Sequence, residues 1–136
     1  MKVVIDTNCL LASIPQKSEH HWLYLAFQAS RFDWYISNEI MREYEEMVSF
    51  RFSEMAAHFV LSRLDISPNV IYAEPYFRWQ LIENDPDDNK FADLAIASQV
   101  DYLVTNDTDF ATLKEYDYLP LRCVTLNQFK QILDWV

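Results

Sequence analysis

Glycine is absent from the 136-residue sequence, so no residue is available that adopts a positive φ without a steric cost. Among the other residues, Asn and Asp tolerate this conformation best. We therefore expect the positive-φ turns of the chain at Asn69, at Asn84-Asp85-Pro86 and at Asn106.

Cysteine and histidine are too scarce and too scattered to predict a zinc site. Cys9 and Cys123 lie far apart without the spacing of metal ligands, and we expect both to stay reduced as small hydrophobic residues. His20 and His21 are adjacent and cannot supply a tetrahedral site, while His58 stands alone in a helical segment. We interpret the three histidines as surface or core residues.

Long apolar runs are also missing. No run approaches the roughly 18 residues that cross a bilayer, and the N-terminal Met-Lys-Val-Val-Ile-Asp lacks the features of a signal peptide. We therefore expect no membrane association and residence in the cytoplasm. The length suits one domain over residues 1–136, and a content of 51% apolar residues argues against disorder.

Basic residues are outnumbered, with 11 Lys and Arg against 21 Asp and Glu and a formal net charge of −10. An acidic protein repels phosphate, so this composition counts against a nucleic-acid partner. The objection weakens if several acids converge on divalent cations, because a bound metal reverses the charge that a phosphate meets. The positions of the acids therefore decide whether nucleic acid is a plausible ligand.

Short β-branched or aromatic runs alternate with amphipathic segments along the chain. Strands are expected at residues 3–5, 34–36, 70–72, 102–104 and 121–124. Helices are expected at 19–30, after a Ser37 cap, at 53–64, from 85–88 to about 99, as a short turn at 109–115, and after a Thr125 or Asn127 cap. This alternation predicts an α/β fold, a three-layer α/β/α sandwich around a central, mostly parallel sheet of about five strands.

Apolar spacing also predicts which side chains of two helices face the core, and leaves one segment open. The residues expected to point inward are Met55, Phe59, Leu61, Phe129, Ile132 and Leu133. Residues 74–83 fit either a loop or a short helix. Their aromatic side chains, Tyr76, Phe77 and Trp79, are interpreted as core or interface packing, with base stacking as the alternative.

Carboxylates stand where two predicted strands end. Asp6 follows the first strand, and Asp107 and Asp109 follow the fourth. Because ligands of open α/β sheets bind outside the carboxyl ends of the strands, these acids are expected to share one edge of the sheet. Taken singly, each could be a cap or a turn residue. Taken together they would repel one another, and Mg²⁺ or Mn²⁺ would hold them ionised.

Four stretches, VVIDTNCLLAS, ISNEIMREYEEMV, DPDDNKFADLAIAS and DYLVTNDTDF, resemble in this order the PIN-domain nucleases, in particular the branch described as toxins of toxin-antitoxin pairs. The resemblance extends over nearly the whole chain. It implies a PIN-like fold, Mg²⁺ or Mn²⁺ as cofactor, single-stranded RNA as substrate and a small antitoxin protein as partner. Carried over by position, it assigns catalysis to Asp6, Glu43, Asp88 and Asp107, and metal binding to Asp6, Asp88, Asp107 and Asp109.

The resemblance also implies supporting roles. Asn8 matches a polar residue that supports the first acid, and Asn106 precedes the fourth. Asp93 is five residues from Asp88 and so about 140° round the helix, which predicts an indirect role. Lys90 lies nearest the expected site and could contact a phosphate. Glu39 and Glu43 share a helix face, and Glu43 is preferred because Glu39 already suits the helix start.

The function expected from this resemblance is hydrolysis of single-stranded RNA by a metal-dependent endoribonuclease that is the toxin of a toxin-antitoxin pair. The alternative is a catalytically weak module that binds an antitoxin-like protein, and a homodimer is a further assembly to test. A haloacid-dehalogenase phosphatase fits poorly, because Asn8 stands where that family needs a second Asp. A receiver domain also fits poorly, because Ala73 and Glu74 follow the third strand.

Overall fold

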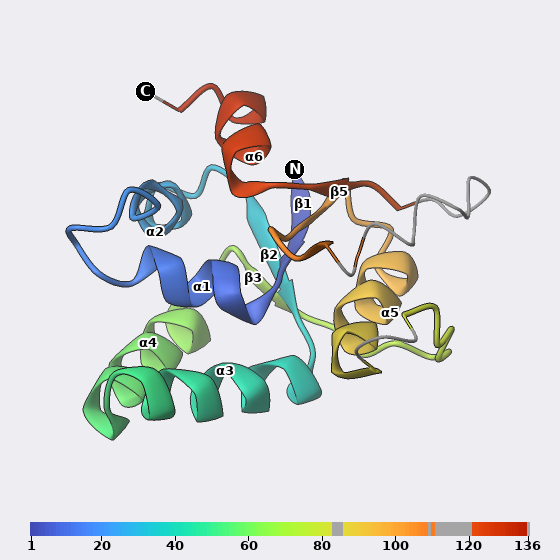
Figure 1. Ribbon diagram of the computed structural model, residues 1–136, viewed down its shortest axis with the longest axis horizontal. Helices are drawn as coiled ribbons and strands as arrows, with labels where there is room; N and C mark the ends of the chain where they lie inside the picture. Colours follow the sequence, from blue (N-terminus) through green and yellow to red (C-terminus); the bar gives the residue numbers. More distant parts are fainter. Residues whose placement is uncertain (83–85, 109, 111–120, 136) are drawn as a thin grey trace.

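A computed structural model of the chain describes residues 1–82, 86–108, 110 and 121–135 (Figure 1). In these residues one sheet has the strand order β3-β2-β1-β4-β5, and every pairing is parallel. The strands are β1 (Lys2–Ile5), β2 (Asp33–Ile36), β3 (Val70–Tyr72), β4 (Tyr102–Val104) and β5 (Cys123–Val124). The predicted α/β sandwich is confirmed, and the sheet is parallel throughout the described part.

Helices cover both faces of the sheet. Figure 1 shows α1 and α2 on one side of the strands and α5 on the other. The helices are α1 (Thr7–Ser13), α2 (Trp22–Gln28), α3 (Asn38–Arg51), α4 (Glu54–Ile66), α5 (Asn89–Ala97) and α6 (Leu126–Ile132), with a 3₁₀ turn η1 (Pro86–Asp88) before α5. None of these described helices is long and apolar enough to cross a membrane.

Three helices begin at side-chain caps, two of which the sequence predicts, at Ser37 and Thr125, while Ser53 is predicted only as a helix start. The Ser37 hydroxyl accepts from the Ile40 amide at 3.2 Å, and the Ser53 hydroxyl accepts from the Ala56 amide at 2.9 Å. At α6 the cap is Thr125 rather than Asn127. Thr125 forms a reciprocal capping box with Gln128, which satisfies two backbone amides at once.

The core is built around a chain of aromatic rings beneath the sheet. Phe27 meets Trp34 edge-on at 5.1 Å, Phe32 meets Phe129 of α6 at 5.3 Å, and Trp34 meets Tyr44 of α3 at 6.1 Å. All five side chains are buried. This cluster joins β2 to helices that are distant in the sequence, and so fixes how α3 and α6 lie against the strands.

Tyr44 carries the buried polar contact of this cluster. Its hydroxyl donates to the backbone carbonyl of Ile5, at the end of β1, and accepts from the Trp34 Nε1–H at 3.3 Å. Both contacts are fully buried, so each group would lose its partner without access to water. The hydroxyl therefore ties α3 to the end of the central strand.

The structure corrects several expected side-chain directions. Met55 and Phe59 were expected to point inward but are 82% and 53% exposed, because α4 has apolar residues on two faces and packs through the other one. Ile132 is likewise exposed in part, whereas Phe129 and Leu133 are buried as expected. Tyr76, Phe77 and Trp79 are also exposed, so the core interpretation of these three rings is wrong.

The positive-φ residues differ from the expected ones. They are Ser30, Gln80, Gln99 and Asp134 in the described part of the chain, and neither Asn69 nor Asn106 is among them. The Asn69 amide is instead buried and donates to the carbonyls of Phe27 and Phe32 at 3.1 and 3.0 Å. The segment from residue 74 to 82 is a loop, while residues 84–85 and most of the predicted turn at 109–115 lie outside the described residues.

Removing the Tyr44 hydroxyl should destabilise the fold. Tyr44→Phe leaves the Ile5 carbonyl and the Trp34 indole N–H buried without this partner, and we expect a loss of about 1–3 kcal/mol in urea unfolding. Tyr24→Phe is the matched control, because the buried Tyr24 hydroxyl has no hydrogen-bond partner among the described residues. Its stability should change by less than about 0.5 kcal/mol. Equal losses in the two variants would contradict the role given to Tyr44.

Candidate functional site

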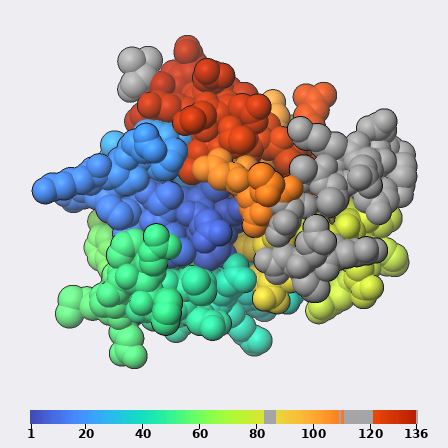
Figure 2. All heavy atoms as spheres, in the orientation of Figure 1, coloured from blue at the N-terminus to red at the C-terminus, as the bar shows by residue number. Residues whose placement is uncertain are grey.

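An acidic cleft lies at the carboxyl end of the sheet, where β1 and β4 are neighbours and the strand order reverses direction. Its volume is about 170 Å³. Figure 2 shows the start of α1, the segment after β4 and α5 meeting on this face of the molecule. We call it the carboxylate cleft after the five acids that line it, which are Asp6, Glu43, Asp87, Asp88 and Asp107.

Asp6 stands at the centre of the site because the chain turns there from strand to helix. It is the N-cap of α1, with Oδ1 accepting from the Cys9 amide at 2.8 Å. Its other oxygen accepts from the Thr105 hydroxyl, just after β4. The same hydroxyl accepts from the Asp107 amide at 3.0 Å. Asp6 and Asp107 are thus held near each other by one threonine.

Glu43 enters the cleft from α3, one turn after Glu39. Its Oε2 accepts from the Thr7 hydroxyl, and its Oε1 lies 2.8 Å from the Lys90 Nζ of α5. The Lys90 side chain is only 9% exposed and lies over the Phe91 ring. A largely desolvated ammonium therefore neutralises one of the cleft's carboxylates.

Asp87 and Asp88 come from η1, the turn that precedes α5, and so lie across the cleft from α1. Thr7, Asn8, Met47 and Phe91 complete the lining. The cleft is therefore assembled from four parts of the chain: the β1–α1 turn, α3, the η1–α5 turn and the segment after β4. Residues separated by about a hundred positions meet because β1 and β4 are adjacent.

Burial works against the charge of the central acid. It raises the pKa of Asp6, and the Asp107 carboxylate adds to the rise, while the Thr105 hydroxyl and the Cys9 amide oppose it. The fold thus holds Asp6 where ionisation is costly in the absence of a cation. A positive ion beside Asp6 would offset a cost of ionisation that an exposed carboxylate does not carry.

The donor atoms of the cleft suit a hard divalent cation. Its acids, with the Thr7 hydroxyl and the Asn8 amide, offer oxygen ligands, which Mg²⁺ and Mn²⁺ prefer over nitrogen and sulfur. Within the described ranges, however, no three His, Cys, Asp or Glu side chains are grouped tightly enough to hold a metal as they stand. The chemistry of the donors fits, and binding would require the carboxylates to draw together.

The sequence-predicted residues divide between this cleft and its surroundings. Glu43 rather than Glu39 lines it. The Asn106 side chain turns away and accepts from the Leu126 amide at the start of α6, at 3.0 Å. Asp93 also lies outside and accepts from the Trp79 amide at 3.0 Å. Asp109 lies outside the described residues.

Two residues of the site, Thr7 and Thr105, were missed by sequence reasoning. They donate to Glu43 and Asp6, and Asp87 also lines the cleft beside the predicted ligand Asp88. A signal for the threonines was available, because Thr105 directly follows β4 and Thr7 comes two residues after β1, at the same edge of the sheet. A hydroxyl at such a position can orient a neighbouring carboxylate.

The burial of Asp6 has a consequence for stability. Well below pH 3.8, the ordinary pKa of the group, Asp6 is protonated in folded and unfolded chains alike and costs little. As the pH rises through the raised folded pKa, the buried carboxyl must ionise and stability is lost. Asp6→Asn should therefore raise the melting temperature in EDTA more at pH 8 than at pH 4.

The control is Asp65→Asn, on the exposed surface of α4, which should show no such pH dependence. Added Mn²⁺ should raise the melting temperature of the natural chain more than that of Asp6→Asn. If Asp6→Asn raises the melting temperature no more at pH 8 than at pH 4, burial does not oppose the charge of Asp6.

Comparison with known proteins places the chain among those with a similar fold. VapBC2 from Rickettsia felis, in a crystal structure bound to a DNA fragment from their promoter, is 20% identical with a TM-score of 0.61, over 92% of this chain and 98% of that one. FitAcB from Neisseria gonorrhoeae is 15% identical with a TM-score of 0.58, over 91% and 97%. The RRP44 PIN domain of T. brucei is 17% identical with a TM-score of 0.52, over 95% and 78%.

No curated protein matches the sequence. The family described as PIN domain matches residues 2–109, a range that includes all five acids of the carboxylate cleft. The match covers most of the sequence and agrees with the fold of the similar structures. The chain therefore belongs to the PIN-domain family.

Proposed function

We propose that this protein is a metal-dependent endoribonuclease that cuts single-stranded RNA. PIN domains are in general nucleases, which are hydrolases of phosphodiester bonds. The observation that supports the proposal most directly is the convergence of five carboxylates on one cleft at the switch point of a PIN fold. A structural role alone does not call for so many acids in one place, because they repel one another.

Asp6, Asp88 and Asp107 are the residues proposed to hold Mg²⁺ or Mn²⁺, with Asp109 as a further ligand and Glu43 bound directly or through water. PIN nucleases generally use divalent metals. When bound, such an ion lowers the pKa of a coordinated water and neutralises charge on the phosphodiester in the transition state.

The residues of the chain prepare this chemistry. The Thr105 hydroxyl and the Cys9 amide hold both oxygens of Asp6, so its orientation is fixed before a ligand arrives. Thr7 does the same for one oxygen of Glu43. Lys90 neutralises the other, and the remaining N–H donors of its ammonium group can face a phosphate. Asn8 is proposed to support Asp6 from the rim of the cleft.

The nuclease proposal is tested with purified protein, Mn²⁺ and mixed-sequence single-stranded RNA. Asp107→Asn and Glu43→Gln should each lower the cleavage rate about a hundredfold or more, as loss of a group that stabilises transition-state charge does. Glu46→Gln, which changes an exposed glutamate on the same helix, should cleave at the natural rate. EDTA should abolish cleavage and Mn²⁺ should restore it. Equal rates for Asp107→Asn and the natural chain, or no cleavage of any RNA tried, would count against the proposal.

We further propose that the nuclease is the toxin of a toxin-antitoxin pair that acts in the cytoplasm. The sequence resemblance suggests this branch of the family, and the likeness in fold to VapBC2 and FitAcB supports it. A toxin of this kind needs a surface that takes a partner protein. An exposed apolar stripe on α4 is a candidate for this partner surface. A catalytically weak interaction module would use the same stripe.

The stripe runs along one side of α4. Met55, Phe59 and Ile66 are 82%, 53% and 73% exposed and recur at spacings that align them on one helix face. Exposed apolar residues in a contiguous group mark an interaction site more often than residues scattered singly. The opposite face of α4, with Ala57, Val60 and Leu64, is already buried in the core.

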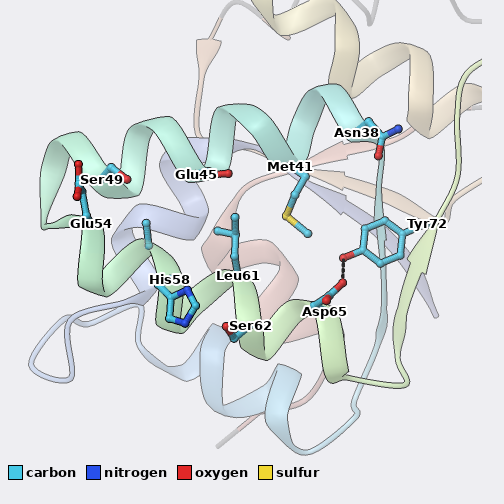
Figure 3. A pocket seen from close by; sticks show the side chains of 11 residues that line it. Asn38, Met41, Glu45, Ser49, Glu54, His58, Leu61, Ser62, Asp65 and Tyr72 are labelled. Carbon is cyan, nitrogen blue, oxygen red and sulfur yellow. Dashed lines mark hydrogen bonds between the residues drawn. The ribbon is translucent and has the colours of Figure 1, made fainter.

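An acidic groove borders the stripe. It lies between α3 and α4, with a volume of about 730 Å³, and Figure 3 shows Met41 and Leu61 on its floor. Glu45, Glu54 and Asp65 stand along it, and no Lys or Arg is among the described residues that line it. An apolar surface with acids of one sign fits a basic amphipathic helix, and we propose such a helix of the antitoxin as the occupant.

The partner surface is tested by coexpressing the chain with each small protein that a neighbouring gene encodes. We expect the chain and one of these small proteins to elute together. Phe59→Lys should weaken the complex at least about tenfold, because the new lysine would be buried against the positive charges of the basic partner helix. Tyr76→Lys, which changes a still more exposed aromatic residue outside the stripe, should leave it intact. An unaffected complex would contradict the assignment. A homodimer of the purified chain that Phe59→Lys dissociates would assign the surface to a second copy instead.

A further inference from the structure

A second cleft adjoins the carboxylate cleft, and we call it the side cleft. It has a volume of about 450 Å³, within the roughly 300–1,000 Å³ of small-ligand sites. Glu39 of α3 lines it from one side, Lys90 and Asp93 of α5 from another, and Arg78, Gln80 and Ile82 from the loop after β3. Neither the family nor the carboxylate chemistry accounts for it.

The wall of the side cleft is held by dedicated contacts. Asn89 forms two hydrogen bonds with the backbone of Ile82, accepting from its amide at 2.8 Å and donating to its carbonyl at 3.0 Å. The buried Asp93 carboxylate accepts from the Trp79 amide at 3.0 Å. Figure 1 shows this loop running beside α5. The loop is therefore fixed on α5, and its polar side chains stand at the cleft.

Shared helices set the distance between the two clefts. Glu39 lines the side cleft and Glu43 the carboxylate cleft, four residues or about 6 Å apart along α3. Lys90 lines the side cleft and also touches Glu43 with its ammonium group. An RNA strand cut at the carboxylate cleft would thus have its neighbouring nucleotide beside the side cleft.

The composition of the side cleft fits a nucleotide. Arg78 and Lys90 are two of only 11 basic residues in a chain of net charge −10, and phosphate needs such cations nearby. Gln80 and Asp93 offer hydrogen-bonding groups for the edge of a base, and the buried Ile82 lies behind the lining. Arg78 lies near enough to Asp93 to oppose the rise that burial causes in the pKa of that carboxyl.

An aromatic pair extends this surface outward. Phe77 and Trp79, on either side of Arg78, meet edge-on at 4.9 Å and are 56% and 39% exposed. Exposed rings beside a cationic residue are the usual platform for bases of single-stranded nucleic acid. Two rings on a fixed loop lose little freedom when a base stacks on them.

We propose that the side cleft binds the nucleotide adjacent to the cleaved phosphodiester, with its phosphate at Arg78 and Lys90 and its base beside Gln80, and that the Phe77–Trp79 pair stacks the base beyond it. This inference rests on the proposed nuclease function. In this proposal the loop after β3 binds the RNA, and the residues of the carboxylate cleft catalyse its cleavage.

The test is a titration of the isotope-labelled natural chain in EDTA, followed by the backbone amide signals of Gln80, Ile82 and Asn89. The probes are the four 5′-nucleoside monophosphates, the matching nucleosides and inorganic phosphate. We expect at least one nucleotide to shift these signals at lower concentration than its nucleoside or phosphate does. Shifts confined to other residues, or an equal response to inorganic phosphate, would overturn the proposal.

Two variants sharpen the result. Arg78→Ala should weaken nucleotide binding about tenfold, as loss of a charge-assisted phosphate contact does. Arg51→Ala removes the same charge at the far end of α3 and should bind normally. Phe77→Ala should weaken binding of a mixed-sequence RNA hexamer about tenfold but leave mononucleotide binding unchanged. Equal losses for Arg78→Ala and Arg51→Ala would overturn the proposal, since net charge would then explain binding.

The two proposals fail in different ways. Nucleotide binding in the side cleft by a chain that cuts no RNA would support the cleft assignment and remove the nuclease. If the protein cleaves RNA but binds no nucleotide in the side cleft, the cleft assignment is overturned and the nuclease proposal stands.

Discussion

The buried carboxylate of Asp6 is the contact on which the site depends. One oxygen caps α1 and the other receives the Thr105 hydroxyl, so a single side chain joins the end of β1, the start of α1 and the end of β4. Tyr44 reinforces the same corner through the carbonyl of Ile5. A group that organises three elements while resisting its own ionisation is stabilising through its hydrogen bonds and destabilising through its charge. A cation bound there, as proposed for this site, would remove the conflict.

The overall acidity of the chain and a role in binding RNA are compatible once charge is considered locally. Acids are concentrated in the carboxylate cleft and along the groove between α3 and α4, whereas Arg78 and Lys90 stand together beside the first of these. Repulsion of phosphate by the whole protein would slow association at low ionic strength, and the short range of screened charges leaves the local contacts effective in the cell. Affinity would then come from few contacts, which suits an enzyme that must release its products.

The sheet and the meeting of Asp6 with Asp107 could be predicted because both follow from general rules: parallel strands present their carboxyl ends at one edge, and ligands bind there. The direction of α4 could not, because apolar residues occur on two of its faces and only tertiary packing decides which is buried. Helix α1 was overlooked, since Asp6 was taken for the end of a strand and is the cap of a helix as well. The ion pair of Lys90 with Glu43 depends on how α3 and α5 pack against each other, which cannot be predicted from the local sequence.

The positive-φ residues bear on whether the stability of the protein comes from its folded or its unfolded state. Ser30, Gln80, Gln99 and Asp134 each hold a conformation that costs a side-chain-bearing residue about 1 kcal/mol. A chain free of glycine recovers part of that cost before it folds, because its disordered ensemble samples fewer backbone states and has less entropy to surrender. Some of the resistance of this protein to unfolding therefore resides in the denatured chain, where no native contact reveals it.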